Sequence, residues 1–311
     1  MKRLKSLILI ILSIMTMLTF VACGSSKSKE NNESKTRIVS TLNGDLEIPT
    51  NPKKIVDLCG VTEELLILGY TPVATTYVDP YGENKVPEYL EYTLRKAKII
   101  EGSDINNINL DKIGSYNPDL IIINESQKDL YDELSSITAT IMIPNYENNW
   151  KDELTYLGEL LDNEEEATKW LSEYERKMES AGEEISKANE GESFLAVLAD
   201  KDSFKIFTNE GLGSIIYDDM KLKKPEVLLE ESSGLVEATM EDINNINADN
   251  IIIILGDEEK ESLSNNDIWK NLKAVKEGTV ISFNKSPVLN GVYNPVGRTM
   301  IIETIREGFT K

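Results

Sequence analysis

The chain has 311 residues, enough for two domains of ordinary size, and its 54 acidic and 33 basic side chains give a formal net charge of −21. This acidity argues against nucleic acid as a partner, because neutralising phosphates requires clustered Lys and Arg. The chain has no histidine and only two cysteines. The commonest general base and transition-metal ligand are therefore missing, and no disulfide framework can hold the fold.

Residues 1–22 are predicted to be a lipoprotein signal peptide. A basic start precedes the uncharged run 7–19, which Phe20-Val21-Ala22-Cys23 closes. Such a run, ended by small residues and a cysteine, is typical of signals whose cysteine becomes lipidated. A membrane-spanning anchor is the alternative, but the run is short for a bilayer and Cys23 would then have no role. Residues 23–36 are polar and are predicted to be a flexible tether.

Residues 37–149 are predicted to form a first α/β lobe. Asn43-Gly44 lies between two alternating runs and predicts a β-hairpin. Strands are expected at residues 54–58, 72–76, 98–101 and 140–143, and helices at residues 63–68, 87–95 and 126–136. The turn-rich segment 77–86 carries two tyrosines that we expect to be exposed. Strands that alternate with helices predict a mainly parallel sheet.

Residues 110–124 and 240–254 repeat one pattern, a short amphipathic helix, a polar turn and a β-branched strand. Aligned without a gap, the copies share Ile113/Ile243, Asn117/Asn247, Asp119/Asp249 and the three isoleucines that follow, and they carry a carboxylate in second place, Asp111 or Glu241. Two copies of half a βαβ unit favour two similar lobes, with chance similarity as the alternative.

Residues 150–190 are predicted to connect the lobes. They contain no proline, and their apolar residues recur at intervals of three and four. We expect a short helix, a break near Asp162-Asn163 and one long helix; an ordinary surface helix is the alternative. Residues 191–311 are predicted to form the second lobe, with strands at 193–198, 204–208 and 279–283, helices at 211–217, 267–272 and 295–307, and a loop at 284–292.

The motifs of the common enzymes are missing from the sequence. No segment matches a P-loop or a dinucleotide fingerprint, and no Ser or Cys has a histidine to activate it. Residues 104–115 resemble a calcium loop but lack its glycine and its final glutamate. A carboxylate pair for glycoside hydrolysis stays open, although no spacing singles one out. We therefore expect no enzymatic activity.

Two lobes, a connecting helix and a tether favour a ligand clamp with its site in the cleft between the lobes. In parallel sheets, the loops after the carboxyl ends of the strands face the crevice. The candidates in such loops are Tyr77, Tyr81, Asn124, Glu125, Lys201, Asn290, Tyr293 and Arg298. Arg298 could bind a carboxylate or a metal-bound oxygen, or could pair on the surface with Glu303 or Glu307.

Three motifs carry a resemblance to a known family. They are Asn51-Pro52-Lys53-Lys54-Ile55-Val56 with the Glu-Leu and Leu-Gly pairs that follow, residues 109–121 (N-L-D-K-I-G-S-Y-N-P-D-L-I), and residues 268–280 (I-W-K-N-L-K-A-V-K-E-G-T-V). The chain resembles the iron-siderophore and cobalamin binding lipoproteins of ABC importers over roughly residues 37–309.

The resemblance implies two Rossmann-like lobes joined by a long rigid helix, with a shallow cleft. It implies a monomer that is lipid-anchored at the extracellular face of the cell membrane and serves a permease and its ATPase. In the family, one acidic residue per lobe docks onto arginines of the permease, and here Asp111 and Glu241 occupy those positions. Asp111 is shorter than the usual Glu. Alternatively, both acids only stabilise their helices, by a favourable interaction with the positive amino-terminal end of the helix dipole.

The resemblance also narrows the ligand. Members that bind bare zinc or manganese use histidines, which this chain lacks. The acidic body and the few arginines of the cleft loops disfavour a triply anionic catecholate. We therefore expect a ferric siderophore of the hydroxamate type, neutral or cationic, with no protein ligand to the metal and no other cofactor. Cobalamin or haem on the same scaffold, and a surface-anchored hydrolase, are the alternatives.

Overall fold

The computed structural model describes residues 35–79, 85–100, 108–147, 149–201, 203–228 and 234–310. Residues 1–34, with the predicted signal peptide and most of the tether, lie outside the described residues, as does Tyr81. The segment Thr36–Lys311 forms one compact unit. Within the described ranges, no helix is both long and apolar enough to cross a membrane.

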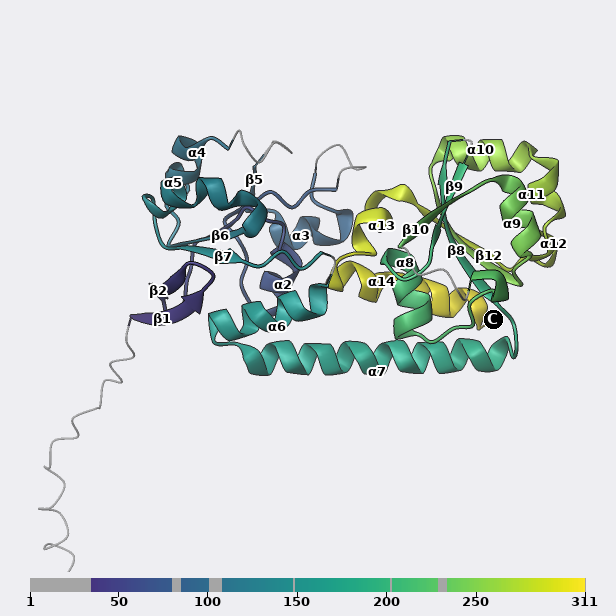
Figure 1. Ribbon diagram of the computed structural model, residues 1–311, viewed down its shortest axis with the longest axis horizontal. Coiled ribbons are helices and arrows are strands. Elements are labelled where there is room, and N and C mark those ends of the chain that lie inside the picture. The colour runs from purple at the N-terminus through teal and green to yellow at the C-terminus, as the bar shows by residue number, and fades with distance from the viewer. Residues whose placement is uncertain are drawn as a thin grey trace, which may run out of the picture. The chain divides into compact units, whose positions relative to one another are not determined.

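The first lobe contains a hairpin and a parallel sheet (Figure 1). The hairpin pairs β1 (Thr36–Thr41) with β2 (Gly44–Pro49) around Asn43-Gly44, as predicted. The sheet has the order β5-β4-β3-β6-β7, and all of its neighbours are parallel. Its strands are β3 (Ile55–Asp57), β4 (Ala74–Thr75), β5 (Lys98–Ile99), β6 (Leu120–Asn124) and β7 (Thr140–Ile143). Its helical segments are α2 (Thr62–Ile67), η1 (Glu88–Leu90), α3 (Glu91–Leu94), α4 (Leu110–Ser115), η3 (Glu125–Leu130) and α5 (Tyr131–Ser135).

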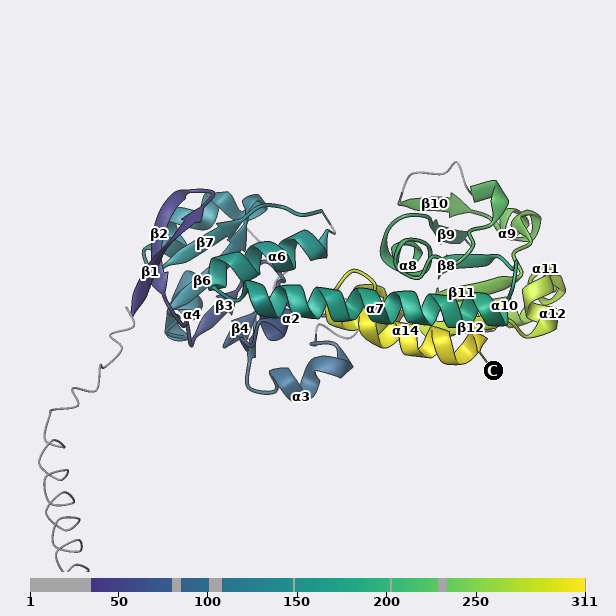
Figure 2. The ribbon, with the colours of Figure 1, turned by 90° about the horizontal axis from the view of Figure 1, so that it is seen from below.

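Two helices connect the lobes, as the apolar periodicity predicts. Helix α6 (Trp150–Leu161) ends at Asp162, whose φ of 59° lies in the left-handed region, and α7 (Glu164–Ala188) follows. Helix α7 contacts α2 of the first lobe and also α14 (Pro295–Phe309), the carboxyl-terminal helix (Figures 1 and 2). Gly182 allows α7 to pack closely against Met220 of the second lobe, because a Cβ there would lie 1.9 Å from the carbonyl oxygen of Met220.

The second lobe has a mixed sheet of order β10-β9-β8-β11-β12. Its strands are β8 (Phe194–Asp200), β9 (Ser203–Phe207), β10 (Leu235–Ala238), β11 (Asn250–Leu255) and β12 (Val280–Asn284). Its helical segments are α8 (Gly211–Gly213), η4 (Ser214–Asp219), η5 (Glu226–Leu228), α9 (Met240–Ile246), α10 (Asp257–Asn265), α11 (Asp267–Asn271), α12 (Lys273–Glu277), α13 (Lys285–Gly291) and α14 (Pro295–Phe309). The predicted class, two α/β lobes with mainly parallel sheets and a long connecting helix, is confirmed.

The second lobe departs from the prediction in several places, including the helices α10 and α12, which were not predicted. Strand β9 pairs antiparallel with β8 and with β10, because a tight turn at Lys201, whose φ is 53°, folds the chain back on itself. Strand β10 was not predicted: its Leu235 and Glu237 are exposed, so it lacks a continuous apolar run. The expected loop at residues 284–292 contains helix α13 instead.

Two kinds of residue shared by the copies of the repeat, an Asn and an Asp, have the same structural role in both lobes. Asn117 and Asn247 follow α4 and α9 with φ of 51° and 47°, a conformation that Asn tolerates better than most residues. The carboxylate of Asp119 accepts hydrogen bonds from the backbone N–H groups of Lys53 and Lys54, just before β3. In the second lobe, the Asp249 carboxylate accepts the N–H and the hydroxyl of Ser193, just before β8. Each aspartate thus ties two neighbouring strand starts together.

The contribution of the Asp249 carboxylate to the free energy of unfolding should change with pH over a narrow acidic range. Although partial burial opposes its ionisation, hydrogen bonds from Lys273 and Ser193 lower the pKa of Asp249 to about 2, from 3.8. A depressed pKa stabilises the folded state above pH 3.8, and this contribution is lost as the pH falls toward 2. We expect Asp249→Asn to lower the free energy of unfolding by roughly 1–2 kcal/mol at neutral pH and by less in acid. Urea denaturation at several pH values measures it.

The control is Asp267→Asn in the same lobe, because the side chain of Asp267 is 93% exposed. Its free energy of unfolding should stay close to that of the wild type at every pH. An Asp249→Asn deficit that does not shrink in acid would contradict the assignment of the effect to the ionised carboxylate.

Candidate functional site

A cavity of about 480 Å³ lies between residues of the first connecting helix and residues of the second lobe. This volume is within the range of small-molecule sites in proteins. The segment that joins β7 to α6 and the start of α6 contribute Glu147, Asn149, Trp150 and Lys151. The second lobe contributes Asn209, Glu210, Gly211, Ser214, Asp219, Gly234, Tyr293 and Arg298. We call this cavity the interlobe pocket.

An aromatic cluster supports the interlobe pocket. Trp150 is buried and meets Tyr174 edge-on, with 4.9 Å between the ring centroids. Trp170 stacks on Tyr174, with 5.5 Å between the centroids and an interplanar angle of 17°, and meets Trp150 edge-on at 5.8 Å. Such pairs add roughly 1 kcal/mol beyond the area that they bury. They fix the rotamer of Trp150, so the pocket has a preformed apolar wall.

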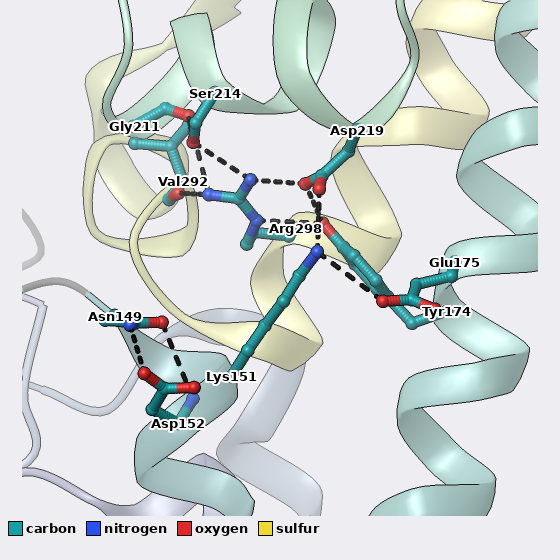
Figure 3. A network of polar contacts seen from close by, with 10 residues as sticks. All are labelled: Asn149, Lys151, Asp152, Tyr174, Glu175, Gly211, Ser214, Asp219, Val292 and Arg298. Atoms are coloured by element: carbon teal, nitrogen blue, oxygen red, sulfur yellow. Dashed lines mark hydrogen bonds and ion pairs between the residues drawn. The ribbon is translucent and has the colours of Figure 1, made fainter.

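Arg298 enters the pocket from the first turns of α14 with its donors already engaged (Figure 3). One terminal nitrogen lies 2.6 Å from the Asp219 carboxylate and 3.0 Å from the Ser214 hydroxyl, and the other donates to the Val292 carbonyl. Its Nε donates to the Tyr174 hydroxyl over 2.9 Å. The guanidinium is therefore held rigidly by the protein itself.

The surface pairs suggested for Arg298 do not form. Arg298 is 3% exposed, and Glu303 pairs instead with Arg306 over 2.8 Å. Helix geometry explains the difference, since residues three or four positions apart share a face and those five apart do not. Asp219, which is 79 positions away in the chain, is the partner of Arg298.

Asp219 is the common acceptor of the network. Although burial opposes its ionisation, Arg298 and hydrogen bonds from Tyr174 and Lys151 hold the pKa of Asp219 below its usual range. Lys151 lies 2.9 Å from the same carboxylate. Both cations that line the pocket are thus paired to Asp219, while Glu147 and Glu210 add two further carboxylates to the lining.

Of the eight predicted ligand-binding residues, Tyr293 and Arg298 line the interlobe pocket. Tyr77 was expected to be exposed, which is wrong: it is 5% exposed and donates its hydroxyl proton to Glu63. Asn124 caps η3, and Glu125 accepts a hydrogen bond from the backbone N–H of Asn145.

The remaining described candidates also lie away from the pocket lining. Lys201 occupies the turn between β8 and β9, a pair of strands that the sequence did not reveal as a hairpin. Asn290 lies on α13, where its side-chain nitrogen is buried. Tyr81 is outside the described residues.

Most of the residues that line the interlobe pocket were not predicted from the sequence. Trp150 and Lys151 were assigned only to the connecting helix, and Asp219 was not singled out at all. Trp150 could have been chosen as a candidate, because it is the first residue of a helix and therefore lies directly next to the preceding loop. Asp219 gave no signal, since its partners come from three distant segments.

The chain matches the model of the periplasmic binding protein family over residues 61–287. The chain belongs to this family. It is accordingly a substrate-binding protein and not an enzyme.

Curated relatives from Bacillus subtilis align along most of the chain. The probable siderophore-binding lipoprotein YfiY is 28% identical and covers 88% of this chain and 89% of its own. The iron(3+)-hydroxamate-binding protein YxeB is 26% identical, with 89% and 88% covered. The Fe(3+)-citrate-binding protein YfmC is 27% identical, with 87% of each covered.

Solved structures share the fold. A FhuD fold-family periplasmic binding protein of a Fep/Fec-like ferrichrome ABC transporter from Bacillus subtilis superposes with a TM-score of 0.70 at 24% identity, covering 88% of this chain and all of its own. Staphylococcus aureus SirA, complexed with staphyloferrin B, gives a TM-score of 0.66 at 24% identity, with 88% and 98% covered.

Removing the guanidinium group of Arg298 should destabilise the folded protein. We expect Arg298→Ala to lower the free energy of unfolding by about 3 kcal/mol, because Asp219 would keep a buried charge without its closest partner. Arg306→Ala on the same helix is the matched control: its partners Glu184 and Glu303 are half-exposed or more, so the loss should stay below about 1 kcal/mol. Chemical denaturation measures both, and equal losses would contradict the burial argument.

Proposed function

We propose that the protein is the membrane-anchored substrate-binding component of an ABC importer and that it captures a ferric siderophore of the hydroxamate type. The names of several relatives, which are siderophore-, hydroxamate- and citrate-binding proteins, support an iron chelate as the ligand. The interlobe pocket is the proposed site, with Tyr293 and Arg298 among its contacts. Iron enters as cargo inside its chelator, so the protein itself need not coordinate the metal.

We choose among the iron chelates by the charge of the residues that line the interlobe pocket. Its described lining holds three carboxylates and two cations, and both cations are paired to one of those carboxylates, Asp219. A ferric trihydroxamate is neutral, whereas a ferric tricatecholate carries three negative charges. Two cations against three carboxylates leave this lining with a net charge of −1, so bringing the trianion near Glu147 and Glu210 would cost Coulomb energy. The pocket therefore favours the neutral or cationic chelate.

Intrinsic fluorescence provides the test. Trp150 lines the pocket, so a ferric chelate bound there should quench tryptophan emission. We expect micromolar or tighter binding of a ferric trihydroxamate and at least about tenfold weaker binding of a ferric tricatecholate. Binding of cobalamin or haem alone would contradict the proposal, as would a preference for the catecholate.

A charge variant sharpens this experiment. Glu210→Gln removes one negative charge from the pocket lining, so it should strengthen binding of the tricatecholate and leave that of the neutral trihydroxamate nearly unchanged. Glu307→Gln is the matched control, because Glu307 is exposed and does not line the pocket. Equal shifts for both ligands would show that charge does not set the selectivity.

We also propose a membrane anchor in the amino-terminal segment and a docking role for two exposed acids. Lipidated Cys23 and the tether of residues 23–36 would hold a monomeric body at the extracellular face of the membrane. Asp111 and Glu241 are exposed in the first turns of α4 and α9. The caps of these helices come from other side chains, Asn109 in α4 and the Thr239–Asp242 pair in α9. Neither acid is therefore needed as a cap, which favours docking to the permease, the partner of the ATPase in the importer.

Docking and ligand capture should be separable. We expect Asp111→Ala combined with Glu241→Ala to leave ligand affinity unchanged while iron-chelate uptake fails, because both side chains lie away from the pocket lining. Fluorescence titration and uptake of radiolabelled iron measure the two effects. Cys23→Ala gives the contrasting result, loss of the protein from the membrane fraction. Weakened ligand binding in the double variant would place the acids in the site instead.

A further inference from the structure

Glu63 of α2 is a fully buried carboxylate that joins two parts of the molecule. Tyr77 and Tyr89, both from the first lobe, donate their hydroxyl protons to one carboxylate oxygen, each over 2.6 Å. The other oxygen accepts the backbone N–H groups of Val296 and Gly297 over 2.6 and 3.1 Å. These two N–H groups belong to the first turn of α14, where a helix leaves its N–H groups unpaired and favours a negative charge.

Helix α14 spans from one lobe to the other. At its start, the side chain of Val296 packs against the cluster of Tyr77, Leu90 and Leu94 in the first lobe. At its end, Phe309 meets Phe194 of β8, with 5.2 Å between the ring centroids. Along its length α14 lies beside α7 (Figures 1 and 2). The lobes therefore have a second rigid connection, and Glu63 anchors one end of it.

The anchored end of α14 also carries one wall of the interlobe pocket. Arg298 follows Gly297 directly, and Tyr293 precedes the helix by two residues. The turn between α13 and α14 is closely packed, because a Cβ on Gly297 would lie 2.4 Å from the Cα of Gly291. Any shift of the first turn of α14 would therefore move Tyr293 and Arg298 relative to Trp150 on α6.

Stability alone does not account for Glu63. Burial raises the pKa of its carboxyl group even though the four donors lower it, so the site does not favour the charge relative to water. Replacing a buried charged group by an apolar one is often neutral or stabilising. What the carboxylate provides is geometry: two acceptor oxygens that fix the tyrosines on one side and the helix on the other.

We propose that Glu63 is a positioning residue that sets the separation of the two lobes and thereby the width of the interlobe pocket. Its effect on affinity rests on the proposed ligand-binding function, whereas its effect on lobe separation does not. Ser286 of α13 donates its hydroxyl proton to Asp79 of the first lobe, a second polar contact across the same boundary. That contact limits how far the lobes can part when Glu63 is changed, so we expect a looser arrangement and not separation.

The experiment measures the distance between the lobes directly. Spin labels at Lys112 on α4 and Asp267 on α11, both exposed, report the separation in the full lipidated protein in detergent, in a Cys59→Ala background. With Glu63 intact, the distance distribution should be narrow without ligand. Glu63→Ala should broaden or shift it, and the dissociation constant for a ferric trihydroxamate should rise by roughly tenfold.

Tyr89→Phe is the matched control. It removes a hydrogen bond to the same carboxylate but leaves both bonds across the lobe boundary, so the distribution should stay narrow. If Glu63→Ala does not fold, Glu63→Gln serves in its place: its amide cannot offer two acceptor oxygens, so broadening is again expected. Unchanged distributions in the Glu63 variants would overturn the proposal, as would equal broadening in Tyr89→Phe. If the wild type binds no trihydroxamate, the proposed ligand fails while the distances still test Glu63.

Discussion

The carboxylate of Asp219 is the interaction on which the site depends. It accepts hydrogen bonds from Lys151 of α6, Tyr174 of α7 and Arg298 of α14, so one buried anion connects three helices. In a low-dielectric interior such charge-assisted bonds reinforce one another, and the loss of one partner leaves the others poorly satisfied. The Asp219 carboxylate therefore ties together the parts of the pocket wall that Lys151 and Arg298 supply.

The same network decides what charge the pocket offers. A lysine and an arginine that could have bound an anionic ligand are both turned inward onto Asp219. The two cations alone are thus a poor guide to ligand charge, since three carboxylates in the same lining leave it with a net charge of −1. The rigid aromatic wall at Trp150 and the paired cations suit a bulky chelate of low charge, bound by shape and contact area.

The two lobes share one local design within sheets of different topology. Asp119 and Asp249 both close the gap between neighbouring parallel strands, and Asn117 and Asn247 both end a helix in the left-handed conformation. The sheets around these units differ, because β9 and β10 turn back antiparallel in the second lobe only. The lobes are therefore alike in the units that join helix, turn and strand, and they differ in the pairing of β9 and β10.

The sequence alone determined the features that local physics controls. Apolar periodicity determined α6, α7 and the break at Asp162, and the Asn-Gly pair determined the first hairpin. The repeat indicated two lobes, because each copy contains its own helix, turn and strand. Tertiary structure alone decided the partners of buried polar groups: Glu63 finds Val296 and Gly297, and Arg298 finds Asp219. Those pairs are separated by 79 to 234 positions, and no periodicity or spacing rule connects residues that only the folded chain brings together.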